Sequence, residues 1–170
     1  MSSRDSILAA IRAAGVPPAA AALSMNAVPG TGDLAEQFVR VLPDVGGKGV
    51  VCSVQQSVED ALVDICKSLG ITQAELLVVY GRFGVAENGA VYVDSNDVDE
   101  RASIVRAEHV ALIVSRESLV PTMHEAVRLM PRDSRCGWFL SGPSKTADIE
   151  QSLVIGAQGA RTLHVLIAPD

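Results

Sequence analysis

The sequence predicts an α/β fold in which helices flank a mostly parallel, open Rossmann-like sheet. From residue 33 onward, segments typical of buried strands alternate with segments typical of amphipathic helices, which is the pattern of strand–helix–strand units. The strand segments are unbroken apolar runs, as in strands that helices cover on both faces. Hydrophobic residues make up 48% of the 170 residues and aromatic residues only 4%, so we expect an aliphatic core in one domain of ordinary size.

The first 32 residues differ in composition from the rest. We expect residues 1–32 to form an N-terminal helix and a linker arm, ahead of a domain that spans residues 33–170. A short helix over residues 3–14 has an apolar face formed by Ile7, Leu8 and Ile11. A stretch rich in Ala, Pro and Gly follows, as in linkers. The helix could pack on its own domain or on a partner, and the sequence does not choose between them.

Capping residues mark the starts of the helices expected in the domain. Asp33, Ser57 and Thr122 stand where a side-chain oxygen can accept a hydrogen bond from a first helical turn. Residues 72–75 match a capping box, but the apolar run LLVVY after them favours a strand. The expected helices cover residues 33–42, 57–69, 122–130 and 146–157.

The strands alternate with these helices, and one pair of strands is expected to be antiparallel. In FGVAENGAVYVD, an Asn-Gly pair separates two alternating stretches, which predicts a tight hairpin. The acidic and polar residues 94–102 predict an exposed loop or a short helix. The expected buried strands cover residues 48–54, 76–80, 109–115, 136–141 and 162–168.

Charge and hydropathy exclude several classes of partner. The formal net charge is −6, which argues against nucleic acid or an anionic membrane as the main partner. No run approaches the ~20 apolar residues of a membrane helix, and charged residues interrupt the apolar start of the chain, unlike in a signal peptide. We therefore expect a cytoplasmic protein without a membrane span. A homodimer is compatible with so apolar a chain.

The cysteines and histidines do not form a recognisable ligand set. There are three cysteines and no CxxC motif, so we expect neither a disulfide framework nor a metal or iron–sulfur site. Cys52 and Cys136 lie in apolar, strand-like runs and are expected to be small core residues. The histidines are far apart in sequence; we expect His109 and His164 at strand ends or in the core, and His124 at a helix start.

The segment 141–150 is the first candidate binding site. It is expected to connect a strand to a helix, and a helix N-terminus with a nearby cation can bind a phosphate or a carboxylate. Asp148 and Glu150 would repel an anion there, and the loop is not a Walker A motif. The alternative is that Ser144 or Thr146 only caps the helix. The candidate ligand-binding residues are Ser141, Gly142, Ser144, Lys145, Thr146 and Asp148.

The turn Glu87-Asn88-Gly89 is the second candidate. A glutamate just before a sharp Asn-Gly turn is presented at a strand end, where it could act as a nucleophile or a base. Asn88 and Gly89 would then contribute to ligand binding beside it. The alternative is a plain hairpin turn with an exposed acid.

Two stretches together resemble a known family. FLSGPSKTADIEQSLVIGAQGARTLHVLI, with FGVAENGAVYV upstream, is similar to the LUD domain of the lactate-utilisation protein C family. The resemblance covers roughly residues 33–168. The family usually has His in the turn where this chain has Gln158, so the chemistry of this member could differ.

The resemblance implies a fold similar to that of ribose-phosphate isomerases and CoA-transferases, and a role in oxidising L-lactate to pyruvate. In that system other subunits hold the iron–sulfur clusters, so we expect iron–sulfur proteins as partners and no cofactor bound by this chain itself. Ala86-Glu87-Asn88-Gly89 also resembles the Ser-Glu-Asn-Gly motif of class I CoA-transferases. That second resemblance implies that Glu87 forms a covalent intermediate with CoA.

These observations and resemblances give three hypotheses for the function. The first is a subunit of an L-lactate-oxidising system that binds a small carboxylate or phosphate, with Lys145 as the anion contact, Asp148 orienting it and Glu87 facing the same cleft. The second is an enzyme acting on a CoA ester or a sugar phosphate, with Glu87 as the catalytic residue. The third is a non-catalytic assembly subunit that docks through the helix at residues 3–14.

Overall fold

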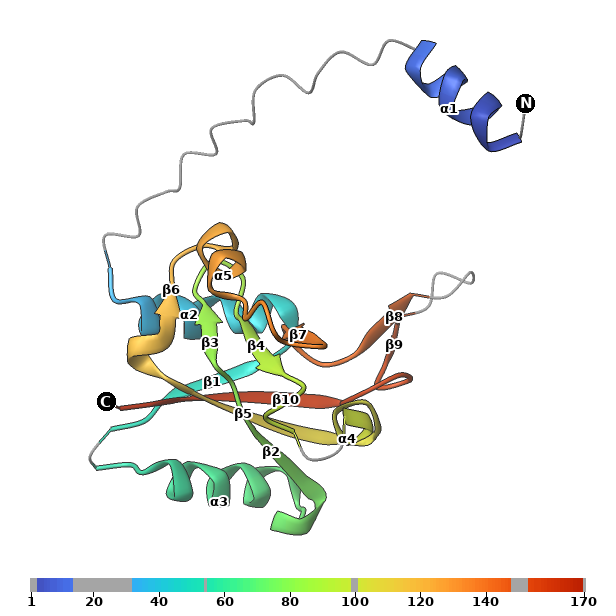
Figure 1. Cartoon of the computed structure of the whole chain (residues 1–170). Coiled ribbons are helices and arrows are strands. Elements are labelled where there is room, and N and C mark those ends of the chain that lie inside the picture. The colour runs from blue at the N-terminus through green and yellow to red at the C-terminus, as the bar shows by residue number, and fades with distance from the viewer. Residues whose placement is uncertain (1–2, 14–31, 54, 99–100, 148–152, 170) are drawn as a thin grey trace.

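Two sheets packed face to face form the body of the protein (Figure 1). The computed structural model describes residues 3–13, 32–53, 55–98, 101–147 and 153–169. Sheet A is entirely parallel and has the strand order β1-β10-β5-β2. Its strands are β1 (Lys48–Val51), β10 (Thr162–Ala168), β5 (His109–Ser115) and β2 (Leu76–Tyr80). The central strands β5 and β10 are almost wholly buried, as their apolar sequences predict.

Sheet B is a mixed four-stranded sheet with the strand order β6-β3-β4-β7. Its strands are β6 (Leu119–Val120), β3 (Phe83–Val85), β4 (Ala90–Asp94) and β7 (Gly137–Leu140). β4 runs antiparallel to both β3 and β7, and β3 pairs in parallel with β6. The predicted hairpin is confirmed, because Asn88 and Gly89 connect β3 to β4. The predicted α/β class, a parallel sheet with an antiparallel pair, is also confirmed.

The core lies between the two sheets and is aliphatic. Val165 and Ile167 of β10 and Val91 and Val93 of β4 are fully buried in one cluster, which Phe38 joins from helix α2 (Leu34–Val41). The other face of sheet A packs against helix α3 (Val58–Leu69). Helices therefore flank the parallel sheet as predicted, with α3 on one face and α2 on the other. Sheet B also covers the second face, next to α2.

Most helix boundaries agree with the capping residues. The side chain of Asp33 accepts a hydrogen bond from Ala35 N at the start of α2. Ser57 and Asp60 form a capping box on α3, which ends at Gly70 with φ +68°. Thr122 caps α5 (Met123–Leu129). The remaining helical segments are α1 (Ser3–Ala13), α4 (Arg101–Arg106), η1 (Leu42–Val45), η2 (Gln73–Glu75) and η3 (Arg116–Ser118).

One predicted helix is wrong. In place of a helix over residues 146–157, β8 (Lys145–Ala147) and β9 (Leu153–Ile155) form an antiparallel pair. Thr146 lies opposite Val154, and β-branched residues of this kind favour strands over helices. Backbone hydrogen bonds hold the base of the hairpin, where Gly156 N donates to Ser144 O at 2.9 Å.

The three histidines lie where they were expected. His109 begins β5, His124 is the second residue of α5, and His164 lies inside β10. None of the helices in the described part of the chain is long and apolar enough to cross a membrane.

The cysteines divide into two buried thiols and one exposed thiol. Cys52 and Cys66 are buried in the cluster under α3. Cys136 was expected in the core, but it is exposed just before β7, so that expectation was wrong. Burial, with Glu59 nearby, raises the pKa of the Cys52 thiol.

We expect Cys136 to react with a maleimide or aromatic disulfide reagent, while Cys52 and Cys66 stay protected, because the thiolate is the reactive form and must reach solvent. The measurement is the time course of thiol modification in the folded protein, with Cys136→Ser as the control. Equal reactivity of all three thiols would contradict the burial described above.

Protonation of His164 should weaken the fold at low pH. Burial, together with nearby Lys48 and His109, lowers its pKa from 6.5 to about 4. The unfolded chain therefore binds a proton near pH 6.5 that the folded chain takes up only near pH 4, so acidification across this window favours unfolding. The loss should be on the order of a few kcal/mol.

Denaturant unfolding curves between these two pH values measure this effect. We expect His164→Gln to remove most of the pH dependence, because glutamine does not titrate, while the nearby Lys48, His109 and Asp64 are unchanged. If the variant lost as much stability on acidification as the unsubstituted protein, another group would be responsible.

Candidate functional site

The loop between β7 and β8 lies at the edge of sheet A where β1 and β10 begin. Ser144 N donates to the carbonyl oxygen of Ala160 at 2.8 Å, two residues before β10. Gly142 lies close to Gly47, just before β1: a Cβ atom built on Gly47 would be 3.6 Å from the Cα atom of Gly142. The loop follows the carboxyl end of β7, as expected, but β7 belongs to sheet B. It therefore meets the amino ends of the parallel strands rather than their carboxyl ends.

Gly142 allows the loop to come this close. Its φ is +74°, a conformation that L side chains rarely adopt. A Cβ atom at this position would also overlap the carbonyl oxygen of Val45 in η1. Glycine is therefore required here both by the backbone conformation and by the contact.

A hydrogen bond joins the two candidate segments predicted from the sequence. Ser141 Oγ donates to the carbonyl oxygen of Asn88 at 2.8 Å, across 53 positions of the chain. Asn88 also closes its own turn, because its Oδ1 accepts a hydrogen bond from Ala90 N at 3.1 Å. Gly89 has φ +65° and lies against Leu42. Ser141, Asn88 and Gly89 thus form one connected surface.

The Glu87 carboxylate points toward α5. Its Oε2 accepts a hydrogen bond from Met123 N at 2.8 Å, in the first turn of α5. This interaction satisfies a free N–H group of the helix, and a carboxylate is favourable at a helix N-terminus. The side chain is exposed. A helix-capping role accounts for this geometry, and the hydrogen bond was not foreseen because it joins residues 36 positions apart.

The remaining predicted residues follow along β8. Lys145 is exposed, and its Nζ lies 3.0 Å from a Cβ placed on Gly46, in the turn before β1. Thr146 is half-buried and pairs with Val154 of β9. Asp148 lies outside the described residues. Because the strand β8 replaces the expected helix, Thr146 does not lie at a helix N-terminus.

A cavity of about 280 Å³ opens beside this loop. Ser141, Gly142 and Ser144 line one side of it, and Gln158 and Gly159 line another. The rest of the lining is mostly apolar and comes from Ile104, Val105, Val110, Trp138, Phe139, Leu140, Ala160 and Leu163. The turn at Gln158, where the chain departs from the family pattern, could have indicated Gln158 and Gly159 as lining residues, whereas nothing in the sequence indicated Trp138.

The chemistry that these groups offer is hydrogen bonding and charge. Ser144 and Gln158 line the cavity, and Lys145 follows Ser144 in the chain, with its Nζ beside Gly46 in the turn before β1. Within the part of the chain that the structure describes, no group of three or more His, Cys, Asp or Glu side chains could hold a metal ion. The arrangement suits a small polar or anionic molecule.

A sequence model of the LUD domain matches residues 69–168, more than half of the chain. The chain belongs to the LUD domain family. Lactate utilization protein C 1 of Bacillus mycoides (strain KBAB4) is 30% identical over 102 residues, which cover 55% of this chain and 44% of that protein. Lactate utilization protein C of Bacillus subtilis (strain 168) is 29% identical over 105 residues, which cover 56% and 43%.

A longer match includes more of the N-terminal half. Uncharacterized protein YkgG of Escherichia coli (strain K12) is 28% identical over 160 residues, which cover 80% of this chain and 69% of that protein. This LUD-family chain therefore spans less than half of the two lactate utilization proteins and about two thirds of YkgG. A DUF162 family protein from Deinococcus radiodurans has a similar fold, with a TM-score of 0.54, 17% identity, and coverage of 79% of this chain and 95% of that one.

We expect Gly142→Ala to destabilise the protein more than Gly70→Ala does. The two glycines have similar φ values, +74° and +68°, but a Cβ on Gly70 would have no atom within 4 Å. Gly70→Ala should therefore cost only the left-handed conformation, about 1 kcal/mol. Gly142→Ala should cost about 2 kcal/mol more, because the loop must move away from Val45. The free energy of unfolding measures both, and equal losses would contradict the contact with η1.

Proposed function

We propose that this protein is a subunit of an L-lactate utilisation system that oxidises L-lactate to pyruvate, and that it binds a small anionic ligand at the loop of residues 141–147. The relatives named lactate utilization protein C support the system. By the same reasoning, its partners are the iron–sulfur subunits of that system, which supply the redox chemistry. The binding role of the loop is supported by the arrangement of this chain's own residues.

The observation that carries the proposal is the hydrogen bond from Ser141 to Asn88, next to a cavity of about 280 Å³. Two family motifs far apart in sequence are held together at one opening. A cavity of this size is close to the lower end of small-molecule sites, and a three-carbon acid needs only part of it. Polar groups at its edge match a carboxylate, and its apolar walls match a short hydrocarbon body.

Each residue has a role in this proposal. Lys145 contacts the anionic group as a point charge, and Ser144 and Gln158 donate hydrogen bonds to it or to a neighbouring hydroxyl. Gly142 keeps the loop against η1 and so fixes the edge of the opening. Asp148 would orient Lys145 or accept a hydrogen bond from a ligand hydroxyl. Glu87 is a positioning residue, because its carboxylate holds α5 next to the Asn88 turn.

A thermal-shift comparison tests the binding role. We expect L-lactate or pyruvate to raise the Tm of the protein, since a ligand at about a hundred times its Kd stabilises a fold by ~2.7 kcal/mol. Lys145→Ala should abolish the shift, because the charge is lost while an exposed side chain contributes little to stability.

Lys67→Ala is the matched control. Lys67 is also an exposed lysine, lies on α3 and forms an exposed ion pair with Asp64 at 3.6 Å. The control should keep the full shift. A shift that survives in Lys145→Ala, or that disappears equally in Lys67→Ala, would remove the loop as the binding site. Phosphate in a parallel arm separates general anion binding from binding of a carboxylate.

A further inference from the structure

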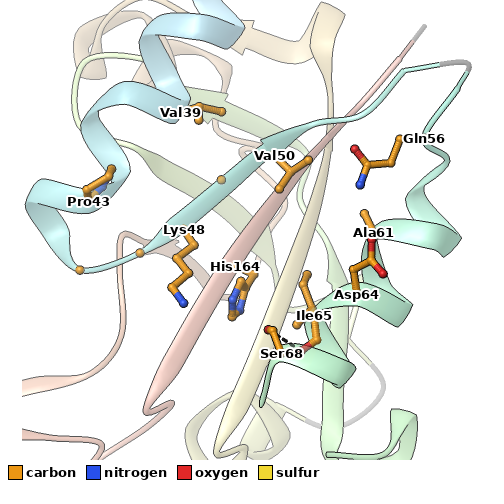
Figure 2. Close-up of a pocket in the computed structure, with 13 residues that line it drawn as sticks. Val39, Pro43, Lys48, Val50, Gln56, Ala61, Asp64, Ile65, Ser68 and His164 are labelled. Atoms are coloured by element: carbon orange, nitrogen blue, oxygen red, sulfur yellow. Dashed lines mark hydrogen bonds between the residues drawn. The ribbon is translucent and has the colours of Figure 1, made fainter. Parts of the chain in front are cut away.

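A second and larger pocket lies on the opposite face of sheet A, between β1, β10 and α3 (Figure 2). Its volume is about 740 Å³, well within the range of small-molecule sites. Much of its lining is apolar and consists of Val39, Pro43, Val50, Ala61 and Ile65. The glycine-rich turn before β1, at Gly46 and Gly47, forms another part of its wall.

His164 contributes a buried polar group to this pocket. The side chain is 5% exposed, lines the pocket, and extends from β10 between Lys48 and Ser68 in Figure 2. Among the described residues, none forms a hydrogen bond with its Nδ1. A buried polar atom without a partner costs free energy, so a molecule that supplies the missing hydrogen bond would be stabilised here. Burial lowers the pKa of His164 to about 4, and the ring is therefore neutral near pH 7.

Charged and polar groups surround this histidine at the open side. Lys48 is exposed and stands directly across from His164 in the register of β1 and β10, which places both side chains on the same face of the sheet. Asp64 and Ser68 approach from α3, and Gln56 precedes that helix. The pocket thus combines apolar walls with the Lys48 ammonium, the Asp64 carboxylate and the His164 Nδ1 atom.

We propose that this pocket binds a small organic anion with an apolar body. The anionic group contacts Lys48, a hydrogen-bonding group of the body pairs with His164 Nδ1, and the apolar body lies between Val50 and Ile65. Asp64 forms an exposed ion pair with Lys67 at 3.6 Å. Its carboxylate only accepts hydrogen bonds, so it favours a ligand that also carries a hydroxyl or an amine. The proposal does not depend on the ligand proposed for the loop, since Lys48 and His164 supply its polar contacts. Lys145 Nζ lies beside Gly46 of the pocket wall and adds positive charge there.

Paired probes separate the two parts of this recognition. AMP and benzoate carry an anion on a flat ring, adenosine and benzamide keep the ring without the charge, and inorganic phosphate has the charge alone. Titration calorimetry should show AMP or benzoate binding about tenfold more tightly than its neutral counterpart, because a hydrogen bond to a charged group contributes ~1.5 kcal/mol or more. Phosphate alone should not bind measurably.

The three lysines of the chain make matched variants possible. Lys48→Ala should bring the affinity for the anionic probe down to that for the neutral one, whereas Lys48→Arg, which keeps the charge, should retain most of the preference for the anion. Lys145→Ala should weaken binding of the anionic probe less than Lys48→Ala does, because Lys145 Nζ lies beside Gly46 and not opposite His164. If Lys145→Ala removed binding while Lys48→Ala kept it, the pocket proposal would be wrong. Loss of L-lactate binding in Lys145→Ala with intact AMP or benzoate binding would separate the two sites.

The imidazole nitrogens supply a second readout that does not depend on a variant folding correctly. In long-range proton–nitrogen NMR spectra, the bound probe should shift the nitrogen resonances of His164 and leave those of the exposed His124 in place. His164→Gln then assigns the resonance. Absence of binding by both anionic probes, or binding without a change at His164, would overturn the proposal.

Discussion

The alternation of side chains along β10 sets the organisation of the molecule. Leu163, Val165 and Ile167 point into the core between the two sheets, and His164 and Leu166 point to the face that α3 covers. A strand buried on both faces must be apolar in both sets of positions. The one polar residue inside this strand is His164, and it lies where α3 leaves a pocket. The same strand begins next to the Ser141 loop, so both proposed sites depend on its position.

Local chemistry accounts for the elements that could be predicted from sequence. Asp33 and Ser57 cap helices because their side chains reach N–H groups only two or three residues away. Asn88 and Gly89 form a hairpin because their backbone preferences suit a tight turn. At residues 72–75 the capping box and the strand prediction were both right, since a short η2 precedes β2. In each case the decisive contacts lie within one turn.

The features that could not be predicted from the sequence depend on contacts between distant segments. The division of strands between two sheets is decided by pairings such as Tyr92 with Phe139. The helix expected over residues 146–157 was inferred from possible caps at Ser144 and Thr146, but cross-strand pairing with β9 competes with those caps. Cys136 lies in an apolar run but directly before the strand begins, where solvent reaches it. Neither the hydrophobic periodicity nor the composition of the segment predicts that Cys136 lies outside the strand and is exposed.

In the candidate site, too, the local features could be predicted from the sequence and the long-range contacts could not. Ser141 and the Glu87 turn could be identified from the sequence as candidates. The structure adds that Ser141 donates a hydrogen bond to Asn88, and that Glu87 accepts one from the first turn of α5.

A growth assay tests the central claim most directly: the gene is deleted in its host and restored as the unsubstituted, Lys145→Ala or Lys67→Ala form. The account predicts that the deletion and Lys145→Ala strains fail on L-lactate but grow on pyruvate, and that Lys67→Ala grows on both. Normal growth of the deletion strain on L-lactate would contradict it.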